Sequence, residues 1–220
     1  SSNMGEVLAI FFGVVLAGAI GLAEAGEGLV LPLLVTQILW INLLTDTGLA
    51  LAMGVDPEVD DVMSRPPRRL TDRVIDARMW RGALIVGSVV AAATLITIDL
   101  YLPGGFFAGD RDLENARTAG FTVLVLAQIF NSLNARSETT TAFHRLFASP
   151  WLWAAIAVTF VLQVAVVHLP PLNVAFGTTP LSLDQWLVCI AMASAVLWAG
   201  ELRKLMASLL TRRQRDESGV

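Results

Sequence analysis

The chain has 220 residues, of which 55% are hydrophobic and only 15% are charged. A soluble domain carries about 25% charged residues, so this composition excludes an ordinary soluble domain and indicates a polytopic membrane protein. The net charge of −4 comes without a basic stripe between aromatic residues, which argues against a nucleic-acid partner, and a single cysteine excludes an internal disulfide.

Six apolar stretches follow one another, each near the ~20 residues that a membrane-spanning helix needs. They cover residues 1–22, 30–53, 79–102, 118–135, 150–169 and 184–204. They are too long and too uniformly apolar for barrel strands, so we predict an all-α membrane protein with six transmembrane helices. The first stretch begins at Ser1 without a basic signal region, and we expect that the chain is a fragment whose first helix has been cut.

The basic residues predict how these helices are oriented. Thirteen of the 15 Lys and Arg residues lie in or beside the loop 54–78, the connection between the fourth and fifth stretches, and the tail 205–220; only Arg111 and Arg117 lie on the other side. Because cytoplasmic loops carry an excess of Lys and Arg, we expect these segments and both chain ends to face the cytoplasm.

Two acidic residues, Glu6 and Asp46, lie well inside the apolar stretches. A charge at the centre of a membrane span costs ~2.5–3.5 kcal/mol on insertion scales. Asn3 and Glu6 are three residues apart in the first stretch and share one helical face. In "WINLLTDTG", Asn42, Thr45 and Asp46 share one face of the second. A short connection makes these two helices antiparallel neighbours, so we expect both polar faces to converge.

This set of side chains predicts a site for a hard cation. Carboxylate, amide and hydroxyl oxygens without sulfur or imidazole suit Ca²⁺, Na⁺ or Mg²⁺. The alternative is hydrogen bonding between helices, but two acids on facing helices repel one another without a cation or a proton. Residues 45–48 are poor helix formers, and we expect a break there that frees backbone carbonyls, as in transporters with discontinuous helices.

Four motifs carry a family resemblance: "SSNMGEV", "QILWINLLTD", "GVDPEVDDVMSRPPR" and "FTVLVLAQIFNSLNAR". In order and spacing, along almost the whole chain, they resemble the C-terminal membrane half of P-type cation-transporting ATPases of the calcium-pump type. The resemblance implies that the six spans match the fifth to tenth helices of such a pump. It also implies that Asn3, Glu6, Asn42, Thr45 and Asp46 coordinate transported Ca²⁺, with the aspartate bridging two ion sites.

The chain departs from the family pattern at several points. Gln128 stands where the reticulum pumps carry a Glu ligand, and "TDTGL" replaces "TDGLP". The family's Pro-Glu-Gly-Leu ligand helix is absent, so these six residues form only part of a site. The Asp-Lys-Thr-Gly, Thr-Gly-Glu and Gly-Asp-Gly-x-Asn-Asp motifs are absent too. We therefore expect no ATP hydrolysis by this chain alone, with ATP and Mg²⁺ acting through the missing domains.

The resemblance also implies partners and a location. Arg65, Pro66, Pro67 and Arg68 lie in the loop that couples the phosphorylation domain to the ion helices in the family; a solvated positive-inside loop is the alternative. The expected partners are the lipid bilayer, the cation and the N-terminal remainder of the pump, in a bacterial plasma membrane. The rival functions are a self-standing channel or secondary carrier, and a non-transporting accessory subunit.

Overall fold

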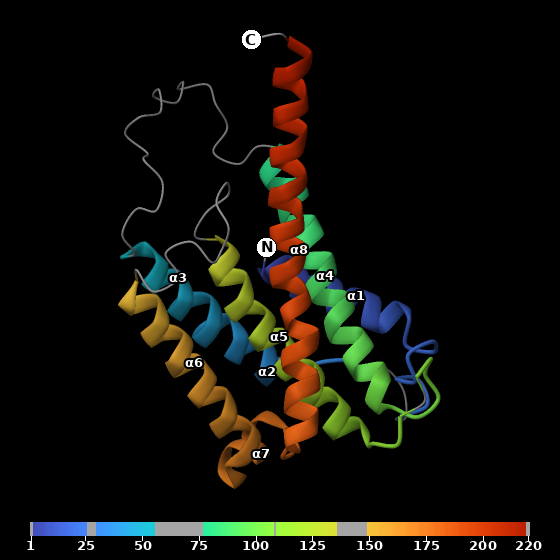
Figure 1. Cartoon of the computed structure of the whole chain (residues 1–220). Helices are drawn as coiled ribbons and strands as arrows, with labels where there is room; N and C mark the ends of the chain where they lie inside the picture. Colours follow the sequence, from blue (N-terminus) through green and yellow to red (C-terminus); the bar gives the residue numbers. More distant parts are fainter. Residues whose placement is uncertain (1, 26–29, 56–76, 108, 136–148, 219–220) are drawn as a thin grey trace.

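The computed structural model describes residues 2–25, 30–55, 77–107, 109–135 and 149–218, without the side chains of residues 2, 45, 46, 77, 78 and 207–218. Every regular element in these ranges is a helix, and the long helices run roughly side by side (Figure 1). They are α1 (Ser2–Val15), α2 (Val35–Trp40), the π-helix η1 (Ile41–Asp46), α3 (Thr47–Gly54), α4 (Ala77–Tyr101), α5 (Leu113–Ala135), α6 (Pro150–His168), α7 (Pro170–Phe176) and α8 (Leu183–Ser218).

Five helical stretches are long and apolar enough to cross a membrane, and they coincide with five of the six expected spans. They are Val35–Gly54, Met79–Tyr101, Leu113–Ala135, Pro150–His168 and Leu183–Met206. The last helix continues well past residue 204, where we expected it to end.

The first expected span, 1–22, is not a single long helix. α1 ends at Val15, and the chain continues in turns to Glu24. Gly21 has a φ of 75°, a conformation that glycine adopts readily and that no α-helix contains. The apolar helix Asn3–Val15 is shorter than the five candidate spans, so the sixth crossing stays a prediction.

The expected break in the second span is wrong. α2, η1 and α3 follow one another without interruption from Val35 to Gly54. The helix widens into a π turn at Ile41–Asp46 instead of ending, and the Thr47 hydroxyl donates to the carbonyl oxygen of Asn42 at 3.1 Å. Single π turns of this kind occur often at functional sites.

α5 is the central helix of the bundle. Residues 118–129 are all buried, and α5 packs against α4, α6, α8 and η1. A helix that is apolar on every side is buried on every side. At Gly120, a Cβ would lie only 2.6 Å from Cγ1 of Ile98, so glycine lets α4 approach closely.

α1 and α4 cross at two glycines. A Cβ on Gly87 would lie 3.0 Å from Cβ of Met4 and 3.1 Å from the backbone nitrogen of Gly5, and a Cβ on Gly5 would lie 2.7 Å from Cγ1 of Val90. Small residues permit this close packing of membrane helices. The crossing holds the second turn of α1, which carries Glu6, against the bundle.

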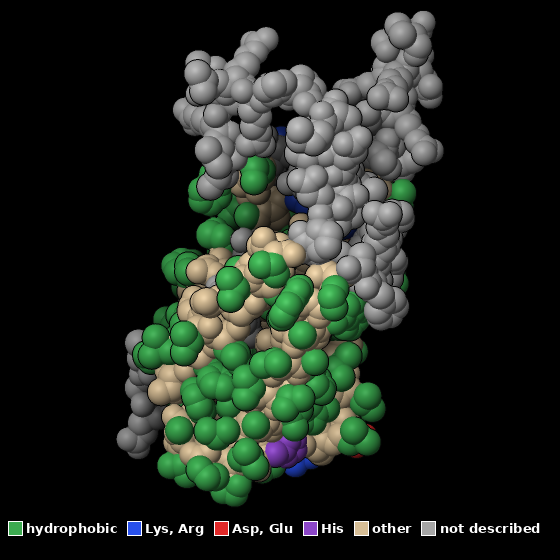
Figure 2. Space-filling model, turned by 90° about the vertical axis from the view of Figure 1, so that its left-hand side faces the viewer, with side chains coloured by type: hydrophobic (Ala, Val, Ile, Leu, Met, Phe, Trp, Pro, Cys, Tyr) green, Lys and Arg blue, Asp and Glu red, His purple; other side chains and the backbone are tan. Residues whose placement is uncertain are grey.

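The outside of the bundle is apolar. Figure 2 shows one face covered largely by hydrophobic side chains, and on α6 Trp151, Val158 and Val161 are each more than half exposed. Monomeric soluble proteins rarely expose apolar patches of such extent, whereas a bilayer covers them. Together with the five long apolar helices, this surface identifies a multi-pass membrane protein.

Candidate cation site

The carboxylate of Glu6 lies inside the bundle and contacts two other helices. Its side chain is only 4% exposed. Oε1 accepts a hydrogen bond from Nε2 of Gln128 on α5 at 2.9 Å, and Oε2 accepts one from Nδ2 of Asn42 on η1 at 3.2 Å. Both oxygens of a buried acid thus have amide partners, which offsets part of the cost of removing the charge from water.

The surrounding helices hold the two amides in place. Nδ2 of Asn42 also donates to the carbonyl oxygen of Ile38, one turn earlier, at 2.9 Å. The backbone carbonyl of Asn42 accepts a hydrogen bond from the Thr47 hydroxyl of α3, so Asn42 is bonded to the helical turns before and after it. Gln128 is 3% exposed within the buried stretch of α5. The three polar side chains are therefore fixed by α1, η1 and α5 together.

This cluster can present its oxygens to a cation. Each amide carries one carbonyl oxygen and one NH₂ group, and here both NH₂ groups face the carboxylate. Rotation of the two amides would replace these donors by oxygens beside the Glu6 carboxylate. The result is an all-oxygen set of the kind that Ca²⁺ and other hard cations prefer.

The other expected ligands stand differently. Asn3 lies on α1 one turn before Glu6, and its side chain is exposed rather than buried with the cluster. Thr45 and Asp46 belong to η1, but their side chains lie outside the described residues. Arg65, Pro66, Pro67 and Arg68 lie wholly outside them. Across the described part of the chain, no three His, Cys, Asp or Glu side chains lie close enough together to hold a metal ion. A cation beside Glu6 would therefore need the amide oxygens of Asn42 and Gln128 as further ligands.

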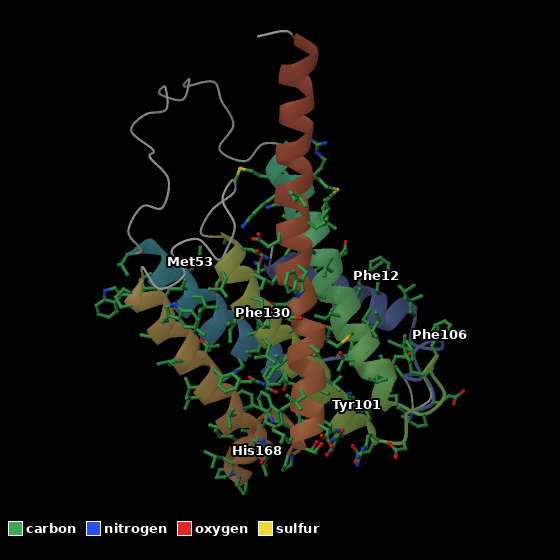
Figure 3. The ribbon with its side chains drawn as sticks, in the orientation of Figure 1. Phe12, Met53, Tyr101, Phe106, Phe130 and His168 are labelled. Atoms are coloured by element: carbon green, nitrogen blue, oxygen red, sulfur yellow. The ribbon has the colours of Figure 1, made fainter. Side chains whose placement is uncertain are left out.

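Several buried polar residues lie outside the site predicted from the sequence, and Gln163 and Asp99 are two of them. Gln163 on α6 is fully buried and donates from Nε2 to the hydroxyl of Thr122 on α5 at 3.2 Å. Asp99, 2% exposed, accepts hydrogen bonds from the backbone nitrogens of Phe106 at 2.9 Å and Phe107 at 3.3 Å, and so holds the loop after α4. Figure 3 labels Phe106 in this loop. A glutamine in the middle of an apolar span is a signal that would have found Gln163.

Comparison with known proteins identifies the class of this membrane protein. Residues 30–206 match the family described as "Cation transporting ATPase, C-terminus". The chain belongs to this family, and it is the membrane C-terminal region of a P-type cation-transporting ATPase.

The individual relatives agree with this assignment. A calcium-transporting ATPase of Bacillus subtilis is 31% identical over 214 residues, which cover 97% of this chain and 22% of that protein. Calcium-transporting ATPase 4, endoplasmic reticulum-type, of Arabidopsis thaliana is 30% identical over 257 residues, with 94% of this chain and 23% of that protein covered. A probable cation-transporting ATPase F of Mycobacterium tuberculosis is 31% identical over 196 residues, which cover 89% of this chain and 20% of that protein. The chain therefore spans about a fifth of the length of these relatives.

Proposed function

We propose that this chain is the ion-carrying membrane half of an ATP-driven pump for Ca²⁺ in a bacterial plasma membrane, with both chain ends in the cytoplasm. The observation that carries the proposal is the buried Glu6 carboxylate bridged by the amides of Asn42 and Gln128. The Bacillus and Arabidopsis relatives are both named as calcium-transporting ATPases, which supports Ca²⁺ as the transported ion. The proposed ligands are Asn3, Glu6, Asn42, Thr45, Asp46 and Gln128.

The hydrogen bonds of Glu6 suggest how the site exchanges its ion. With the amide NH₂ groups on the carboxylate, each of its two oxygens accepts one hydrogen bond. A dication offsets the cost of rotating both amides, because it gains the two amide oxygens together with those of the carboxylate. Catalytic domains elsewhere in the pump would supply ATP-driven phosphorylation, and movement of η1 against α1 would separate Asn42 from Glu6. Glu6 and Asp46 would then give up the cation and take protons.

The test compares two glutamates in the intact pump. Glu6→Gln removes the buried charge, whereas Glu24→Gln removes an exposed charge in the turns after α1. We expect Glu6→Gln to raise the Ca²⁺ concentration for half-maximal phosphorylation by ATP at least about tenfold, the equivalent of about 1.4 kcal/mol, and Glu24→Gln to leave it unchanged. Asp46→Asn should abolish Ca²⁺-dependent phosphorylation.

Two results would contradict the proposal. Normal Ca²⁺-stimulated phosphorylation in both Glu6→Gln and Asp46→Asn would exclude these carboxylates as ligands. Stimulation of the wild type by Na⁺ or Mn²⁺, but not by Ca²⁺, in the same assay would overturn Ca²⁺ as the transported ion.

A further inference from the structure

A cavity of about 460 Å³ lies between α1, α4, α5 and α8, apart from the Glu6 cluster. Met4, Met79, Trp80 and Val86 provide apolar walls, and Asn134 and Arg203 provide polar ones. Glu6, Asn42 and Gln128 are not among the residues that line this cavity, so the cavity is distinct from the cluster around Glu6.

The position of the cavity along the bundle matches the level of lipid headgroups. Met79 is the first residue of the α4 span, Asn134 is the last residue but one of the α5 span, and Arg203 lies in the final turn of the α8 span. Tyr101 and His168, at the far ends of α4 and α6, lie at the opposite end of the bundle (Figure 3). The cavity therefore lies where the hydrocarbon core meets the polar interface.

The cavity offers a positive charge beside apolar surface. The guanidinium of Arg203 lies over Gly82, where a Cβ would collide with Nη1, so the glycine makes room for it. No carboxylate pairs with Arg203 among the described residues. An arginine in this setting can pair with the phosphate of a ligand in a bidentate manner.

A second polar group in the wall lacks a partner. Asn134 is 7% exposed; its Nδ2 donates to the carbonyl oxygen of Val196 at 3.0 Å, while its Oδ1 has no hydrogen-bond partner. A buried acceptor without a partner costs about 1–3 kcal/mol. That oxygen has almost no accessible surface, so it is closed off from the cavity, and Arg203 is the charged group that a ligand in the cavity would meet.

We propose that this cavity binds the headgroup of an anionic phospholipid, with its phosphate on Arg203 and an acyl chain that runs deeper into the bundle past Ala83 and Val86. Phosphatidylglycerol is such a lipid, since its phosphate carries one negative charge. Basic pockets between transmembrane helices bind anionic lipid headgroups, and the apolar walls favour a lipid over free phosphate. The site does not depend on which cation is transported.

The experiment measures lipid retention by native mass spectrometry of the intact protein, purified in detergent and titrated with dioleoyl phosphatidylglycerol or dioleoyl phosphatidylcholine. Arg203→Ala removes the proposed partner of the phosphate. Arg81→Ala is the matched control, because Arg81 is exposed near the same end of α4 and does not line the cavity. We expect Arg203→Ala to weaken phosphatidylglycerol binding about tenfold and Arg81→Ala to change it less than twofold. Arg203→Lys should fall between the two, because lysine keeps the charge but loses the bidentate geometry.

Ala83→Phe fills the cavity without changing any charge. Ala83→Phe should weaken phosphatidylglycerol binding as Arg203→Ala does. If Arg203→Ala fails to fold, Ala83→Phe still tests whether the lipid binds in this cavity. Equal affinities for the two lipids, or equal losses in Arg203→Ala and Arg81→Ala, would overturn the proposal. Displacement of the lipid by millimolar glycerol 3-phosphate would contradict the proposal that the ligand is a lipid, and would instead indicate a site for soluble phosphates.

Discussion

The pairing of Gln128 with Glu6 leads to a prediction with a defined sign. Gln128→Glu replaces an amide nitrogen, 2.9 Å from Oε1 of Glu6, by a carboxylate oxygen at about the same distance. Both side chains are at least 96% buried. Two like charges 4 Å apart repel by about 4 kcal/mol at an effective dielectric constant of 20. The empty site is therefore destabilised, and either a dication or a proton relieves the repulsion.

The expected result depends on pH. At pH 8 the repulsion favours Ca²⁺ entry, and the apparent affinity of Gln128→Glu should rise about ten- to hundredfold, or about 1.4–2.8 kcal/mol. Protons relieve the same repulsion and so compete with Ca²⁺ for the pair of carboxylates, more strongly at pH 6 than at pH 8. The gain should then largely disappear, whereas the wild type should depend less on pH.

The assay is Ca²⁺-dependent phosphorylation of the intact pump by ATP at pH 6, 7 and 8. Gln185→Glu is the control, since Gln185 is a buried glutamine at the start of α8 that bonds to Asn115 rather than to Glu6. An unchanged affinity in Gln128→Glu at every pH would refute the reasoning, and so would the same shift in Gln185→Glu.

Three further substitutions test the packing that positions the site. Gly87→Val should lower the midpoint of thermal unfolding in detergent, because overpacking against Gly5 at the α1–α4 crossing costs about 1–3 kcal/mol. Asp99→Ala removes the acceptor of two loop amides, and hydrogen exchange measured by mass spectrometry should become about tenfold faster at residues 106–107. Thr47→Val removes the hydroxyl that bonds to the carbonyl of Asn42, and the Ca²⁺ concentration for half-maximal phosphorylation should rise about threefold.

Each of these substitutions has a matched control. Gly18→Ala adds a methyl group where no atom lies within 4 Å, so it should leave the unfolding midpoint unchanged. Asp110→Ala removes a carboxylate that is 93% exposed, and Thr36→Val alters an exposed threonine on α2. If a control substitution changes the measured quantity as much as the variant it is paired with, the contact removed by that variant does not explain the effect.

Sequence alone determined the class of the protein and the place of most of its helices. Backbone groups in lipid must bond within a helix, so a long apolar stretch has few alternatives. α4 was expected at 79–102 and is Ala77–Tyr101, and α6 was expected at 150–169 and is Pro150–His168. The helical period also placed Glu6 and Asn42 on converging faces, and the structure joins them.

Only the tertiary structure decided how the polar groups meet. Glu6 and Gln128 are 122 residues apart, and no local period relates them; a family resemblance, not the residues themselves, singled out Gln128. A propensity scale predicts a break at 45–48, but the structure has a π turn over Ile41–Asp46 followed directly by α3, with a hydrogen bond from the Thr47 hydroxyl to the Asn42 carbonyl that such a scale does not count. The cavity at Arg203 likewise forms only because segments of four helices that are distant in sequence pack beside one another there.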